Sequence, residues 1–121
     1  MIINGILGAL VGVTGGCAVV TPIESVFIGT VGAFLANATA KLLLFLKVDD
    51  AVGATCVHGF GGFWGMIVVG LFGKKDNLEG FLQHSGLFHG GGFYLLGVQF
   101  LACICFIIWS SIVTFILIKV C

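Results

Sequence analysis

The sequence predicts an all-α protein, a polytopic transmembrane helix bundle with four membrane spans. Of its 121 residues, 60% are hydrophobic and only 8% are charged, and the mean hydropathy is +1.25. These values lie outside the range of water-soluble domains. The apolar residues also run in nearly uncharged stretches of about 20 residues, which matches a hydrocarbon core of about 30 Å crossed at about 1.5 Å per residue.

Four stretches have the length and apolar character of spans. Residues 25–46, 51–72 and 93–118 are the clearest, and residues 73–92 form a polar loop before the last of them. The stretch at residues 2–20 is uncharged, but five glycines weaken it as an independent helix. It lacks the positively charged start of a signal peptide, and its glycines are spread through the apolar run, so a fourth span is the better interpretation.

Short polar motifs mark where two of the helices begin. Thr21, Pro22 and Glu24 have the spacing of a capping box with proline at the first helical position. Asp49 and Asp50 precede the third span and place acceptors and negative charge at the positive end of its helix. We therefore assign both aspartates a structural or conformational role, and favour it over ion binding.

His58 is the most informative residue, because it lies in the middle of the span at residues 51–72. Ionisable side chains at that depth are rare, face a bundle interior or a cavity, and often mark a transport path. The residues three, four and seven positions away are small, so we expect the ring to face protein or a cavity. A neutral imidazole has one donor and one acceptor nitrogen and can pass a hydrogen bond along a pore. The alternative is a histidine that only joins two helices.

Other features exclude several classes of function. Zero net charge argues against a nucleic-acid partner. The five cysteines lack metal-ligand spacing, and His84 and His89 read as solvated loop residues, so we expect no metal and no cofactor. Thr14 has the carbonyl of Leu10 within reach, and on the residues alone a structural role is favoured for it. The spans hold no paired carboxylates, Ser/His pair or metal cluster, so an enzyme is not expected.

Small residues and lysines indicate packing and orientation. Gly8, Gly12 and Gly16 recur every four residues, a spacing that allows close helix contact in lipid. Three lysines, at positions 41, 47 and 119, lie on one predicted side of the membrane, against two at positions 74 and 75 on the other. The positive-inside rule favours the first side as cytoplasmic.

Two sequence blocks carry a resemblance to a known family. Residues 48–54, VDDAVGA, lead into residues 57–65, VHGFGGFWG, and this block resembles the signature around the second pore histidine of the ammonium transporter family (Amt/MEP/Rh). Residues 4–11, NGILGALV, with Thr14 resemble the eighth membrane helix of that family, and parts of residues 86–99 resemble its approach to the last helix. Ala51 departs from the family pattern, which has proline there.

The resemblance implies an eleven-helix fold, with ten helices arranged as two inverted five-helix halves around a pore in each protomer of a homotrimer. The chain would then be a fragment of a longer transporter that supplies helices eight to eleven, the last of them peripheral, in a multi-pass protein of the plasma membrane. The implied substrate is ammonium, which loses a proton so that ammonia passes two stacked histidines. By the same resemblance His58 is the second of these histidines, Thr14 a pore-facing hydroxyl, Ala54 a wall position and Asp50 a carboxylate near the cytoplasmic end.

Two interpretations of function stay open at this point. The chain is either the part of an ammonium/ammonia channel that contributes the second pore histidine, or a truncated membrane subunit or packing fragment without transport of its own. The first pore histidine and the aromatic gate of the family lie outside these 121 residues. We therefore expect the chain expressed alone to give no ammonium uptake.

Overall fold

The computed structural model describes residues 1–75 and 82–120, and in these residues every regular element is a helix. In chain order they are α1 (Ile2–Thr14), α2 (Pro22–Phe45), the π-helical turn η1 (Thr55–Phe60), α3 (Gly61–Phe72), the 3₁₀ turn η2 (Leu87–His89) and α4 (Tyr94–Val120). The prediction of an all-α fold is confirmed for this part of the chain.

Within the described residues, three helices are long and apolar enough to cross a membrane: Pro22–Phe45, the continuous η1–α3 helix Thr55–Phe72, and Tyr94–Val120. The first predicted span is shorter than expected. Helix α1 has 13 residues, which gives it a length of about 20 Å, less than a hydrocarbon core of about 30 Å. It stops at Thr14 because the chain turns there through i→i+3 hydrogen bonds, from the N–H of Gly16 to the carbonyl of Val13 (3.1 Å) and from Val19 to Gly16 (2.9 Å).

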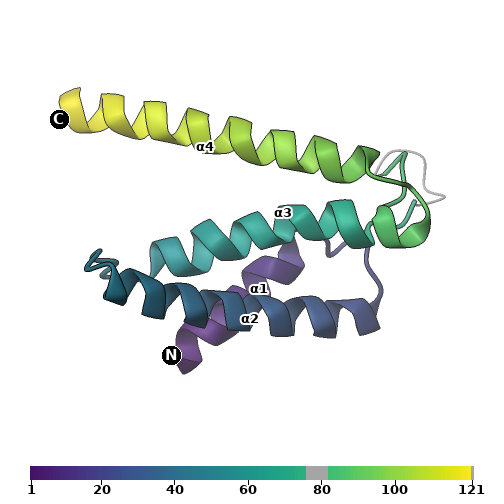
Figure 1. The fold of residues 1–121 in the computed structure, drawn as a ribbon, viewed down its shortest axis with the longest axis horizontal. Coiled ribbons are helices and arrows are strands. Elements are labelled where there is room, and N and C mark those ends of the chain that lie inside the picture. Colours follow the sequence, from purple (N-terminus) through teal and green to yellow (C-terminus); the bar gives the residue numbers. More distant parts are fainter. Residues whose placement is uncertain (76–81, 121) are drawn as a thin grey trace.

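Figure 1 shows η1–α3 between α2 and α4, with α1 crossing behind α2 and α3. The contacts agree with this arrangement, since α1 packs on both α2 and α3, and α4 packs on α3. The backbone N–H of Lys74 donates to the carbonyl of Val19 (2.8 Å). The turn at residues 15–21 and the end of α3 therefore lie at the same end of the bundle, which we call the turn end.

The core lies between α1, α2 and α3, where backbones approach closely. A Cβ atom added to Gly32 would lie 2.6 Å from the carbonyl oxygen of Gly8, and one added to Gly15 would lie 2.5 Å from that of Gly65. Only glycine fits such contacts, and small residues allow this packing in lipid. Ile28, Val68 and Cys56 fill the remaining space and are fully buried, whereas α4 is almost entirely exposed.

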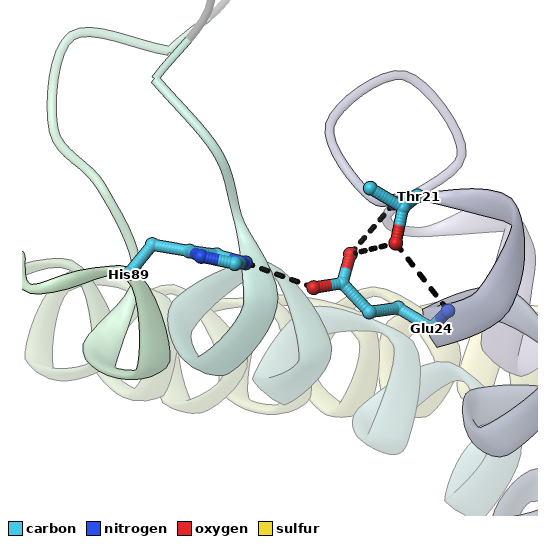
Figure 2. A network of polar contacts seen from close by, with 3 residues as sticks. All are labelled: Thr21, Glu24 and His89. Atoms are coloured by element: carbon cyan, nitrogen blue, oxygen red, sulfur yellow. Dashed lines mark hydrogen bonds and ion pairs between the residues drawn. The ribbon is translucent and has the colours of Figure 1, made fainter.

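A polar network joins α2 to η2 at the turn end (Figure 2). The predicted capping box is confirmed: the hydroxyl of Thr21 accepts from the N–H of Glu24 (3.4 Å), and the Glu24 carboxylate accepts from the N–H of Thr21 (2.7 Å). The other carboxylate oxygen of Glu24 lies 2.9 Å from Nε2 of His89. The expectation that His89 is a solvated loop residue is therefore wrong, because the side chain of His89 is 26% exposed and paired. His84 is exposed and packs on Tyr94, with ring centroids 4.8 Å apart.

Candidate pore-facing groove

His58 lies on the π-helical turn η1, which Asp50 caps. One carboxylate oxygen of Asp50 accepts from the backbone N–H groups of Thr55 (3.0 Å) and Cys56 (3.2 Å). The helix starts at Thr55 rather than at residue 51, because Gly53 has a φ of +68° and turns the chain before it. Asp50 thus accepts from the first two N–H groups of the helix, while Asp49 lies exposed beside it. Single π-helical turns are often found at functional sites, and here the turn forms the start of the continuous η1–α3 helix.

The side chain of His58 opens into a groove between η1–α3 and α4 with a volume of about 1110 Å³. Ala54 and Gly62 lie one helical turn before and after His58 and line the same groove. Because both are small, the imidazole is not covered by its own helix. The structure therefore brings together two of the residues singled out in the sequence, His58 and Ala54.

The opposite face of the same helix is packed against protein. The indole N–H of Trp64 donates to the carbonyl of Ile28 (3.0 Å) on α2, and Val57 and Val68 are buried. The helix thus has a packed face and a groove face. His58 belongs to the groove face together with Phe63 and Met66, and Val57, Trp64 and Val68 belong to the packed one.

Thr14 lies apart from His58, at the last residue of α1. Its hydroxyl donates to the carbonyl of Leu10 (2.6 Å), as the sequence predicted. This bond uses the donor of the hydroxyl and leaves its lone pairs free to accept. The structure does not place Thr14 among the residues that line the groove with His58.

The far wall of the groove, on α4, carries hydroxyl groups that the sequence reasoning missed. They belong to Ser110, Ser111 and Thr114, three hydroxyl residues within five positions of an otherwise apolar span. Their clustering could have predicted this wall from the sequence, because polar side chains in a membrane helix usually face protein or a cavity. Together with the imidazole they give a mostly apolar groove a few donors and acceptors suited to a small polar molecule. The described residues hold no group of three or more His, Cys, Asp or Glu side chains placed to hold a metal ion.

Comparison with known proteins identifies the family of the chain. The model of the Ammonium Transporter Family matches residues 1–121. The chain belongs to the ammonium transporter family. The resemblance inferred from the blocks around Asp50 and His58 is thereby confirmed, and the apolar helices identify a multi-pass membrane protein of this family.

Individual ammonium transporters match along most of the chain. Putative ammonium transporter 1 member 5 of Arabidopsis thaliana is 39% identical over 113 residues, which are 89% of this chain and 23% of that protein. Putative ammonium transporter 2 of Caenorhabditis elegans is 38% identical over 126 residues, with 97% of this chain and 24% of that protein covered. Ammonium transporter 1 member 1 of A. thaliana is 38% identical over 113 residues, 89% of this chain and 23% of that protein.

The chain spans about a quarter of the length of these ammonium transporters. No solved structure matches it significantly.

Proposed function

We propose that this chain forms part of an ammonium/ammonia channel in the plasma membrane and supplies one of its pore histidines, His58. The observation that carries the proposal is the position of His58 on the groove face of a membrane-spanning helix whose other face is packed. Membership of the ammonium transporter family supports ammonium as the substrate. The complete transporter is proposed to be a homotrimer.

The chemistry of the groove suits a neutral molecule better than an ion. Moving an ammonium ion from water into an apolar passage costs many kcal/mol, while neutral ammonia loses far less. Ammonium can lose a proton before it enters and pass as neutral ammonia. A metal cation of any size keeps its charge and therefore pays the full desolvation cost. A neutral imidazole at His58 then offers the molecule one donor and one acceptor as it passes.

The other proposed residues support this path. The methyl group of Ala54 keeps the wall beside His58 apolar and leaves the imidazole uncovered, and Asp50 fixes where the helix begins and hence the direction of the His58 side chain. The free lone pairs of Thr14 are proposed to accept hydrogen bonds from the substrate at another level of the pore. Asp49 has no role in the path and is proposed to add negative charge at the helix start.

A chimera tests the proposal, because the chain covers about a quarter of its relatives. Residues 1–121 replace the matching segment of A. thaliana ammonium transporter 1 member 1, and labelled methylammonium uptake is measured in uptake-deficient cells. We expect the chimera to transport and His58→Ala to lower uptake at least about tenfold, since each 1.4 kcal/mol of lost interaction changes a rate about tenfold. A chimera that reaches the membrane but shows no uptake, or a His58→Ala variant with unaltered uptake, would contradict the proposal.

The 121 residues expressed alone are expected to give no uptake. The groove beside His58 is open, and nearly all of α4 is exposed, so the path has no closed wall. Membrane fractions that contain the chain should show background methylammonium accumulation. Saturable uptake by the chain alone would mean that it builds a complete pore by itself.

A further inference from the structure

The indole of Trp64 joins α3 to both of its neighbours in the core. Its N–H donates to the carbonyl of Ile28 on α2 (3.0 Å), and Ile28 is itself fully buried. On the other side the ring lies against α1 at Gly12, where an added Cβ atom would come within 2.9 Å of Cδ1 of the indole. Trp64 therefore occupies a slot that α1 and α2 form together.

The hydrogen bond of Trp64 limits how the helix can rotate about its axis. Gly61 and Gly65 let the backbones of α3 and α1 approach closely, and these contacts set the distance between the helices. A hydrogen bond depends on angle as well as distance, so it forms over a narrow range of rotations. Among the described residues, the Trp64 bond is the one hydrogen bond from α3 to α1 or α2. An indole N–H that loses its partner in apolar surroundings costs free energy, and the bond therefore opposes rotation.

His58 lies on the same continuous helix as Trp64. Trp64 follows it by six residues, which is roughly 9 Å along the axis at about 1.5 Å per residue. The two side chains lie on different faces, because His58 opens into the groove and Trp64 is held by α1 and α2. A rotation of about 20° would move an imidazole that lies roughly 6 Å from the axis by roughly 2 Å. Hydrogen bonds form between about 2.7 and 3.2 Å, so a shift of this size would break a bond made by the ring.

We propose that Trp64 is a positioning residue, whose bond to Ile28 fixes the rotation of η1–α3 and thereby the direction of the His58 ring. This inference rests on the proposed function of His58. Trp64 lines a different hollow from His58, and it acts on the transported molecule only through His58. Its loss should therefore matter only while His58 is present.

A double-mutant cycle in the chimera tests this dependence. Trp64→Phe keeps an aromatic ring in the slot and removes the N–H donor. We expect the initial rate of methylammonium uptake, divided by the amount of protein in the membrane, to fall roughly two- to tenfold. In a His58→Ala background the same substitution should cause no further fall, because the residue through which it acts is gone. Trp109→Phe is the matched control, since Trp109 is 68% exposed on α4, and it should leave uptake unchanged.

Gly12→Ala disturbs the slot from α1 and keeps the test valid if Trp64→Phe is poorly folded. Its added Cβ would clash with the indole, so uptake should fall in the parent and fall no further in the His58→Ala background. Gly97→Ala, with nothing within 4 Å of its added Cβ, should leave uptake unchanged.

Two results would refute the positioning role. One is a Trp64→Phe variant that transports like the parent. The other is an equal fall with and without His58, which is what a general loss of structure would give. If His58→Ala alone still lowers methylammonium uptake in either case, only the positioning role fails. An unaltered His58→Ala variant overturns the proposed function itself.

Discussion

At the scale of single residues, the predictions that succeeded depend on neighbours in the sequence. The capping box of Thr21 and Glu24 and the bond of Thr14 to Leu10 each join residues three or four positions apart. Helix geometry fixes such contacts, so a sequence is enough to predict them. The pair of His89 with Glu24 joins residues 65 positions apart. It depends on how the chain folds back, which no local pattern encodes.

Substitution of Asp50 tests its contribution to the start of the η1–α3 helix. Asp50→Ala removes the acceptor of two backbone N–H groups, at Thr55 and Cys56. Loss of a helix cap costs about 1 kcal/mol, with a range of roughly 0.5–2 kcal/mol. We expect a lower thermal unfolding temperature of the purified chimera in detergent. Asp49→Ala, which removes the exposed neighbouring carboxylate, should leave that temperature nearly unchanged, and an equal loss for both variants would argue against the cap.

At the scale of elements, the sequence identified the helices but not all of their ends. The stretch at residues 2–20 reads as one apolar run, yet α1 stops at Thr14 and the chain turns. Hydrophobicity alone does not distinguish a turn of small apolar residues from a helix, and the glycines at positions 15 and 16 were the only local sign. The glycine stripe was a better guide, because it marked close contacts of this segment with both neighbours: Gly8 faces Gly32 of α2, and Gly12 faces Trp64 of α3.

Substitution of Gly32 tests how closely α1 and α2 pack against each other. A Cβ at position 32 would lie 2.6 Å from the carbonyl oxygen of Gly8, so Gly32→Ala must push α1 away from α2. Overpacking of this kind costs about 1–3 kcal/mol. We expect a clear loss of thermal stability in the purified chimera. Gly97→Ala is the control, because nothing lies within 4 Å of its added Cβ, and it should be neutral or stabilising by up to about 1 kcal/mol. Equal effects of the two substitutions would contradict the close packing.

At the scale of the whole molecule, several contacts hold the turn end together, while in the part of the chain that the structure describes α4 packs on α3 alone among the long helices. The His89–Glu24 pair, the bond of Lys74 to Val19 and the ring contact of Phe72 with Phe88 (4.9 Å between centroids) tie three segments together. Most of α4 lies exposed. The sequence showed that α4 is apolar enough for a membrane. It could not show which face of α4 meets α3, because that depends on how the chain folds back.

Substitution of His89 tests whether its pair with Glu24 stabilises the turn end. His89→Ala removes the partner of the Glu24 carboxylate, while the capping box of Thr21 stays intact. A partly exposed pair of this kind contributes up to about 1 kcal/mol. We expect faster hydrogen exchange of the backbone at residues 86–91 and unchanged exchange in α2. Gln83→Ala, at an exposed position of the same segment, should leave exchange as it is. Unchanged exchange in His89→Ala would show that the pair does not hold the turn.

If His58 contacts the transported molecule, its loss must affect uptake far more than the loss of a histidine elsewhere in the chain. Initial rates of methylammonium uptake are measured for His58→Ala and His84→Ala in the chimera, each divided by the amount of protein in the membrane. Both variants remove one imidazole, but His84 lies exposed between α3 and α4. We expect a loss of about tenfold or more for His58→Ala and a rate close to the parent for His84→Ala. Equal rates for the two variants would contradict it.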